Sequence, residues 1–399
     1  MNTFQKAKQY LIQTYFQYPI EIIKGKGSFV WDKNNKKYLD FYGGHAVALL
    51  GHCPNKIVSA MMKQAQTLIF YSNIFPTKPA ADLAEKIAKT LLPQEYKVFF
   101  ANSGSEANEN AIKMARKFTG KKHVISFKDS FHGRSTVCTA VTGIPSYHQF
   151  FPDIDEYSSF AELGSIESVK VLHNDDTAAV ICEPIQSIGG VNMAKKKFYK
   201  DLEQFCHDKG ILLIFDEVQT GLGRTGTFWF SQKLSVKPDI LTTAKGLASG
   251  LPISCVLVAK KIADTIKMNE YATTFGGGPL VCAAGLATLK VILNKGFLKN
   301  VEINSQFLQK ELQKISAVKQ VLGAGLLLGV EFKEEYPGLV EKCLKNGLIV
   351  GSSKNSKVFR ILPPLNITKK ESKLFLQLLK KSLISLYDGR SKKILSFKI

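Results

Sequence analysis

The stretch ILLIFDEVQ, residues 211–219, decides the predicted fold because a continuous apolar run ends abruptly in Asp216 and Glu217. Such a run is typical of a strand buried on both faces of a parallel sheet. Helical patterns separate it from comparable runs elsewhere in the chain, which are KVFFAN at 97–102, HVISF at 123–127, AAVICEP at 178–184, DILTTAK at 239–245 and PISCVLVAK at 252–260. This alternation predicts an α/β fold with a mainly parallel central sheet covered by helices on both faces.

The pattern changes after residue 280. Its candidate elements are long helices at 281–293, 300–315 and 371–387 and a short strand around GLLLGVEF at 325–332. We expect a smaller α+β unit to begin near residue 300. The predicted organisation is an N-terminal segment at 1–50 that packs with the small domain, a large domain at 51–300 and a C-terminal small α+β domain at 301–399.

Composition excludes several classes of protein. With 399 residues, of which 45% are hydrophobic, the chain can bury a large core, so disorder and small disulfide scaffolds are excluded. Its seven cysteines lie far apart, without the spacing of a metal site, and we expect reduced, mostly buried thiols and no metal. No apolar run approaches the roughly 18 residues of a membrane helix, and the first residues lack the pattern of a secretory signal. We therefore expect a cytoplasmic protein without a membrane partner.

The charge balance is strongly basic, at +21 from 54 basic and 33 acidic residues. Such a charge would suit nucleic acid or an acidic partner. Only five of the basic residues are arginine, however, and the lysines are spread along the chain. Sites that grip phosphate backbones usually use more guanidinium groups. The pattern favours a solvated basic surface over a nucleic-acid site.

The segment NSGSEANENAIKMAR, residues 102–116, follows a predicted strand and opens a helix. Ser103 and Glu106 have the spacing of a capping box. The free N–H groups of such a helix would point at whatever lies above Gly104 and Ser105, which is a suitable place for an anion. An ordinary capped helix is the alternative interpretation of this segment alone.

Two further strand ends carry reactive side chains. Asp216 and Glu217 end one strand, and Lys245 ends another, in PDILTTAKG at 238–246. Desolvation at such a position lowers the pKa of a lysine and makes its amine nucleophilic. An anion site, an acid and a free amine are what pyridoxal phosphate requires for its phosphate, its pyridinium nitrogen and its aldehyde. Together the three segments point to that cofactor.

The segment GLGRTG, residues 221–226, also matches the glycine pattern of dinucleotide-binding folds. The residues after it, TFWFSQ, do not open an amphipathic helix. No acidic residue stands at a strand end about 20 residues further on, where that fold places one. The dinucleotide interpretation is therefore disfavoured.

Seven motifs follow one another in an order and spacing that belong to one family: NSGSEANENAIKMAR, FHGR at 131–134, EPIQ at 183–186, IFDEVQTGLGRTG at 214–226, PDILTTAKGLASGLPI at 238–253, TTFGGGPLVCAA at 273–284 and RILPPL at 360–365. The chain resembles the class III (ω-type) pyridoxal-phosphate aminotransferases, and among them the acetylornithine and succinylornithine aminotransferases. The similarity extends from about residue 38 to about residue 365, most of the chain.

This resemblance implies a fold type I homodimer with its active site at the subunit interface. It assigns Lys245 as the residue that bonds to the cofactor aldehyde and later moves a proton, and Asp216 as the partner of the pyridine nitrogen. The other cofactor contacts that it implies are Gly104 and Ser105 at the phosphate, Phe131 against the ring, Gln219 at the phenolic oxygen, and Thr274 of the partner subunit at the phosphate.

The resemblance also suggests how substrate is bound. Arg134 and Arg360 would bind substrate carboxylates, while Glu183 and His45 are further candidates for substrate contacts. Arg224 is interpreted as structural, because loop arginines often bind backbone carbonyls. The chain departs from the family pattern in EPIQSIGG, where Ile188 replaces a glutamate that can pair with the arginine equivalent to Arg360. A satisfied structural role is the alternative for His45.

We therefore expect an enzyme that moves an amino group in two half-reactions. The donor would be an ω-amino acid, such as N-acetyl- or N-succinyl-ornithine, and the acceptor 2-oxoglutarate, in arginine or related amino-acid biosynthesis. One alternative is a same-fold enzyme that acts on another amine or on a substrate tethered to an acidic carrier protein, which the positive charge would suit. The alternative from another class is a basic nucleic-acid-binding protein on an enzyme scaffold.

Overall fold

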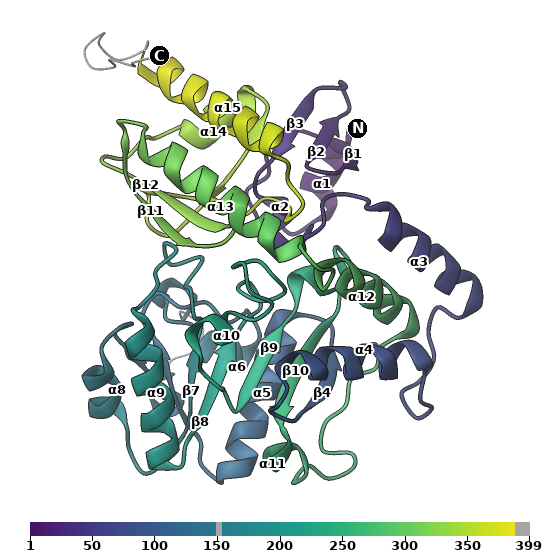
Figure 1. Ribbon diagram of the computed structural model, residues 1–399, viewed down its shortest axis with the longest axis vertical. Coiled ribbons are helices and arrows are strands. Elements are labelled where there is room, and N and C mark those ends of the chain that lie inside the picture. Colours follow the sequence, from purple (N-terminus) through teal and green to yellow (C-terminus); the bar gives the residue numbers. More distant parts are fainter. Residues whose placement is uncertain (149–153, 388–399) are drawn as a thin grey trace.

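The structure is a computed structural model that describes residues 1–148 and 154–387, and it has a large and a small part (Figure 1). The large part is built on a seven-stranded sheet of order β4-β10-β9-β8-β7-β5-β6. Its strands are β4 (Tyr96–Ala101), β5 (His123–Phe127), β6 (Ser158–Ala161), β7 (Thr177–Cys182), β8 (Leu212–Asp216), β9 (Ile240–Thr243) and β10 (Ser254–Ala259). Strand β10 runs antiparallel to both of its neighbours, β4 and β9, and the other neighbouring strands of this sheet pair in parallel. The predicted α/β fold with a mainly parallel sheet is confirmed.

Helices cover both faces of this sheet (Figure 1). The helices between residues 55 and 292 are α3 (Asn55–Thr67), α4 (Lys78–Ala88), α5 (Gly104–Thr119), α6 (Thr136–Ala140), α7 (Ile154–Tyr157), α8 (Ile166–Leu172), α9 (Lys196–Lys209), α10 (Phe230–Leu234), α11 (Lys260–Ala263) and α12 (Pro279–Ile292), with single 3₁₀ turns at Lys89–Leu91, Pro145–Tyr147 and Lys245–Ala248. Of these, α3 packs against α12. Strands β5, β7, β8 and β9 are buried along their whole length, which explains their continuous apolar sequences.

The local sequence determines where helix α5 begins and ends. Ser103 is its N-cap, and the Ser103 hydroxyl accepts a hydrogen bond from the Glu106 N–H. The Glu106 carboxylate accepts from the N–H of Asn102 rather than from that of Ser103, so the predicted capping box is shifted by one residue. The helix ends at Gly120, whose φ of 70° suits glycine.

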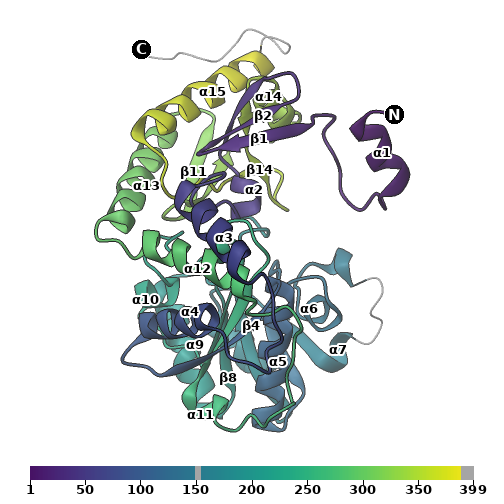
Figure 2. The same ribbon diagram turned by 90° about the vertical axis from the view of Figure 1, so that its right-hand side faces the viewer.

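The small part contains two four-stranded sheets, of order β1-β2-β3-β13 and β11-β12-β15-β14. Their strands are β1 (Ile22–Lys26), β2 (Phe29–Asp32), β3 (Lys37–Asp40), β11 (Val318–Ala324), β12 (Leu327–Phe332), β13 (Leu348–Ile349), β14 (Gly351–Ser352) and β15 (Val358–Ile361). The helices are α1 (Thr3–Tyr10), α2 (Gly43–Ala46), α13 (Phe297–Gln313), α14 (Leu339–Lys345) and α15 (Lys369–Tyr387), and Figure 2 shows α13 and α15 side by side.

Strands β3 and β13 pair in parallel although they lie far apart in the sequence, and Leu39 of β3 is the register partner of Leu348 of β13. The N-terminal strands therefore share a sheet with a strand from the C-terminal region. The domain boundaries at residues 50 and 300 stay a prediction. All seven cysteines are free and only Cys53 is exposed, as expected. Within the described ranges no single helix could span a membrane by length and composition; α12 and α13 pass that test only as a pair bent by 69°.

Candidate active site

The carboxyl ends of five strands border one cavity of about 440 Å³. Ligands in open α/β sheets bind at such an edge. The predicted site residues in its wall are Gly104 and Ser105 after β4, Phe131 and Arg134 after β5, Glu183 after β7, Asp216 at the end of β8, Gln219 after β8, and Lys245 after β9. Ile188 lines the cavity too, whereas Thr274, His45 and Arg360 lie outside its lining.

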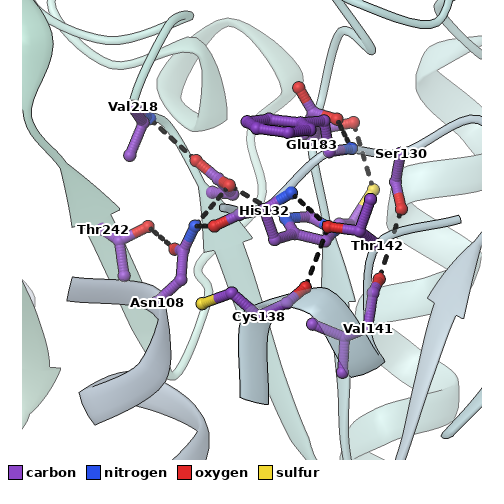
Figure 3. Close-up of polar contacts among 12 residues, drawn as sticks. Asn108, Ser130, His132, Cys138, Val141, Thr142, Glu183, Val218 and Thr242 are labelled. Carbon is purple, nitrogen blue, oxygen red and sulfur yellow. Dashed lines mark hydrogen bonds and ion pairs between the residues drawn. The ribbon is translucent and has the colours of Figure 1, made fainter. Parts of the chain in front are cut away.

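The Asp216 carboxylate lies in a buried hydrogen-bond network, drawn in Figure 3. Its Oδ2 accepts from the Asn108 amide at 2.7 Å and lies 2.8 Å from His132 Nδ1, while Oδ1 accepts from the Val218 N–H at 3.0 Å. Asn108 is fixed in turn, because its amide donates to the His132 carbonyl and its oxygen accepts from the hydroxyl of Thr242. This network holds a negative charge at the floor of the cavity in one orientation.

Asn108 and His132 are not among the site residues predicted from the sequence. A sequence pattern could have identified both of them. Asn108 lies one helical turn after Gly104, on the face of α5 that is buried, and His132 stands within the FHGR motif. His132 Nε2 has no hydrogen-bond partner in the described part of the chain.

Glu217, the second carboxylate at the end of β8, faces away from the cavity. Its oxygens accept from the N–H groups of Phe230 and Ser231 at 2.6 and 2.8 Å, and from the Thr220 hydroxyl at 3.2 Å. Burial raises the pKa of Glu217 to about 6, although these bonds favour the charged form. The two adjacent carboxylates therefore have different environments, and only Asp216 is available to a ligand.

The Lys245 amine is held by no hydrogen bond or ion pair from any residue that the structure describes. The residue has φ of 32° and begins the turn after β9. Burial lowers the pKa of Lys245, and the positive charge of Arg360 acts in the same direction, while Asp216 and Glu183 oppose the shift. A buried amine without a partner and with a lowered pKa is suited to attack a carbonyl carbon.

A phosphate fits the start of α5. The N–H groups of Gly104 and Ser105 lie in the first turn, where the helix itself offers no acceptor. Close packing holds this loop in place: a Cβ on Gly133, whose φ is +135°, would lie 2.3 Å from Ser105 Oγ. That hydroxyl accepts from the N–H groups of Arg134 and Ser135 at 3.1 and 3.0 Å.

Two further cavity residues fit a polar aromatic ligand. The Oε1 atom of Gln219 is buried and has no partner among the described residues, so the amide is free to bind a ligand. Phe131 lines the cavity, and its N–H donates to the Glu183 carboxylate at 2.7 Å. Burial raises the pKa of Glu183 to about 7, against the opposing charge of His132. A flat, phosphorylated pyridine therefore matches the polar groups that this cavity presents.

The predicted carboxylate-binding residues lie around the cavity in different environments. Arg134 is exposed, and its guanidinium carbon lies 3.8 Å from the centre of the Tyr147 ring. Arg360 is buried on β15 and bonds to neutral oxygens. The ring of His45 lies 4.6 Å from that of Tyr42, and the loss of solvent around it lowers the pKa of His45, as do the charges of Arg360 and Lys245.

Two other sequence-based expectations concern residues outside this cavity. Arg224 is buried and donates to the carbonyls of Leu326 and Pro363, which confirms its structural interpretation. Thr274 is exposed and lines a separate cavity together with Phe70 and Thr273. Within one chain it does not reach the site around Lys245.

The fold and the cavity define a pyridoxal-phosphate enzyme of fold type I. The family model described as "Aminotransferase class-III" matches residues 11–383. The chain belongs to the class III aminotransferases, and it is an enzyme whose cofactor is pyridoxal phosphate.

Curated relatives cover nearly the whole chain. It is 40% identical over 390 residues to an acetylornithine aminotransferase of Caldanaerobacter subterraneus, covering 95% of this chain and 98% of that protein. An acetylornithine aminotransferase of Methanocaldococcus jannaschii is 39% identical over 380 residues, covering 92% of this chain and 94% of that protein.

Solved structures show the same fold. The ornithine aminotransferase of Toxoplasma gondii superimposes with a TM-score of 0.90 and 30% identity, covering 97% of this chain and 95% of that one. The N-acetylornithine aminotransferase of Stenotrophomonas maltophilia gives a TM-score of 0.82 at 30% identity, covering 95% of this chain and 99% of that one.

Proposed function

We propose that this aminotransferase moves the amino group of an N-acylated ornithine, either N-acetyl- or N-succinyl-ornithine, to 2-oxoglutarate in arginine biosynthesis. The unpartnered Lys245 amine, in one cavity with the fixed Asp216 carboxylate, is the observation that carries the chemistry. The N-acetylornithine substrate is supported by curated relatives about 40% identical to this chain. A comparison of the two amino donors as substrates identifies the acyl group.

Lys245 and Asp216 have different chemical roles in the proposed reaction. When bound, pyridoxal phosphate supplies an aldehyde that condenses with amines and a ring that accepts electrons. Lys245 would offer its amine to that aldehyde and would carry the proton that moves at the substrate carbon. Asp216 keeps the pyridine nitrogen protonated, and the network of Asn108 and His132 keeps that carboxylate in place.

Binding of cofactor and substrate falls to the surrounding loops. The N–H groups of Gly104 and Ser105 bind the phosphate, Phe131 packs on the ring, and the Gln219 amide contacts the phenolic oxygen. Arg134 and Arg360 bind substrate carboxylates, because a planar guanidinium matches both oxygens of a carboxylate. Glu183, in the cavity wall, and His45, outside its lining, are further candidates for substrate contacts.

The active enzyme is a homodimer in which Thr274 of the partner subunit completes the phosphate site. Exposed Thr274 lies away from the Lys245 cavity of its own chain, beside the large exposed side chains of Phe70, Ile74 and Phe275. An apolar surface of this kind is typical of a subunit interface. Mixing Lys245→Ala chains with Thr274→Ala chains tests this, since mixed dimers would contain one intact site.

One spectroscopic experiment tests the function. The purified protein should be yellow, its absorbance should change when N-acetylornithine is added, and 2-oxoglutarate should restore it. A parallel series with N-succinylornithine, ornithine and 4-aminobutyrate ranks the amino donors. A protein that contains the cofactor but shows no spectral change with any of these donors would contradict the proposal.

A further inference from the structure

The guanidinium of Arg360 bonds only to neutral oxygens among the residues that the structure describes. Its Nε donates to the Ser352 carbonyl at 2.6 Å, one terminal nitrogen donates to the Tyr42 hydroxyl at 2.6 Å, and the other to the Ser187 hydroxyl at 3.3 Å. A guanidinium has five N–H donors, so two of them keep no acceptor here. The side chain is only 6% exposed. No described carboxylate forms an ion pair with it, although the charge of Glu183 acts on it from farther away. A buried charge without an ion-paired partner favours the binding of an anion.

Tyr42 is built into this arrangement. Its ring lies against β14 at Gly351, which is the register partner of Arg360 in the neighbouring strand. A Cβ on Gly351 would lie 2.0 Å from Cε2 of Tyr42, so only glycine leaves room for the ring. The ring centre is 5.3 Å from the guanidinium carbon. The hydroxyl accepts from Arg360, and its own proton remains available to a ligand oxygen.

The position of Ile188 removes the competing anion. Ile188 lines the cavity next to Ser187, and its carbonyl accepts from the Lys354 N–H at 2.8 Å, which fixes the loop. It stands where the family pattern has a glutamate. Burial raises the pKa of Tyr42, so the phenol is neutral near pH 7 although the charge of Arg360 opposes the shift. Among the described residues, an arriving carboxylate therefore has no ion-paired carboxylate to displace from Arg360.

We propose that Tyr42 is a specificity-determining residue whose hydroxyl, with the Arg360 guanidinium, forms a carboxylate site that stays open in both half-reactions. This inference rests on the proposed function and deepens it. The chemical class that fits is a five-carbon dicarboxylate such as 2-oxoglutarate or glutamate. An amino donor with a carboxylate beside its reacting amine engages the same site, so this enzyme accepts such donors as well as N-acylornithines.

Calorimetric titration with glutarate tests the site without requiring turnover. Glutarate has the two carboxylates of 2-oxoglutarate but neither a keto nor an amino group. We expect Tyr42→Phe to raise the Kd of the holoenzyme for glutarate roughly tenfold, because a hydrogen bond to a charged pair is lost. Tyr42→Glu should raise this Kd further, since the new carboxylate would pair with the Arg360 guanidinium. Tyr10→Phe, which removes an exposed hydroxyl on α1, is the matched control and should bind as the wild type does.

Kinetics separate a binding role from a structural one. Tyr42→Phe keeps the ring against Gly351, so we expect it to fold, to raise KM for 2-oxoglutarate and to change the maximal rate of the N-acetylornithine half-reaction little. Wild-type Kd values for glutarate in both Tyr42 variants would overturn the inference. If the wild type binds glutarate through Tyr42 but transaminates no donor, the proposed function fails while the carboxylate site stands.

Discussion

His132 Nδ1 lies 2.8 Å from Oδ2 of Asp216, and the two side chains are 0% and 4% exposed. This pair places a carboxylate at the floor of the cavity, where its charge acts on Lys245 without a direct bond between the two side chains. The Lys245 amine, by contrast, forms no ion pair with any residue in the described ranges. The site therefore separates a fixed negative charge for the cofactor ring from a free amine for its aldehyde.

Asp216→Asn should reduce the rate of each half-reaction by at least roughly a hundredfold, because the ring nitrogen loses the charge that keeps it protonated. Stopped-flow absorbance measures each half-reaction. Glu217→Gln is the matched control: this neighbouring carboxylate faces away from the cavity and bonds to the start of α10. We expect that variant to melt at a lower temperature with nearly normal half-reaction rates. Near-normal rates in Asp216→Asn would show that the assignment is wrong.

Lys245→Ala should remove the covalent attachment of the cofactor. Borohydride reduction followed by peptide mapping should find the cofactor on residue 245 of the wild type and on no residue of the variant. Lys260→Ala changes an exposed lysine that pairs with Asp264 at the surface of the same part, and it should be labelled like the wild type. An adduct on another lysine would contradict the role of Lys245.

Glu183→Gln should change how stability depends on pH. Because the folded pKa is raised from 4.5 to about 7, the folded state binds this proton more tightly than the unfolded state. Glu183 therefore favours folding below pH 4.5, and this contribution is lost as the pH rises through about 7. The variant should gain about 1–3 kcal/mol relative to wild type between pH 5 and pH 8. Melting temperatures of both holoenzymes at the two pH values measure this; equal differences would refute it.

Gly133→Ala should weaken cofactor binding by displacing the loop around Ser105. The added Cβ would lie 2.3 Å from Ser105 Oγ, in a backbone conformation that favours glycine. Gly120→Ala is the control, because Gly120 also has a positive φ but a Cβ there meets no atom within 4 Å. Both variants should lose stability, whereas only Gly133→Ala should release cofactor faster during dialysis. Equal retention in the two variants would exclude a role of this packing.

Ile188→Glu should place a competing carboxylate near Arg360. We expect KM for 2-oxoglutarate to rise roughly three- to tenfold, because the keto acid must now displace an anion from the guanidinium. Ile188→Gln has the same size without the charge and should change KM much less. If the two variants have equal KM values, charge at position 188 does not control access to Arg360.

The central sheet could be predicted because its strands are apolar along their length and end in polar residues. The edge where those strands end could be predicted for the same reason, and Asp216, Gly104 and Lys245 do lie in one cavity. Periodicity does not describe contacts between distant loops, however. Asn108 on α5 and His132 in the loop after β5 both bond to Asp216 on β8. These three elements lie far apart in the sequence, so no local pattern predicts their contacts.

Other features depend on the environment that the fold creates. Asp216 and Glu217 are adjacent in sequence. Only the fold shows that Glu217 accepts a hydrogen bond from the start of α10 while Asp216 faces the cavity. The hydrogen bond from Arg360 to Tyr42 could not be predicted from the sequence either, because it depends on the close packing of Gly351 against the Tyr42 ring. The residue roles and the dimer stay predictions that the experiments above address, and the cytoplasmic location stays a prediction as well.

The pairing of β3 with β13 has a consequence for biosynthesis of the protein. Leu39 leaves the ribosome well before its register partner, Leu348, is synthesised. The nascent N-terminal strands therefore wait, exposed, while the seven-stranded sheet is already able to assemble behind them. We expect this interval to be the time when chaperones are most needed.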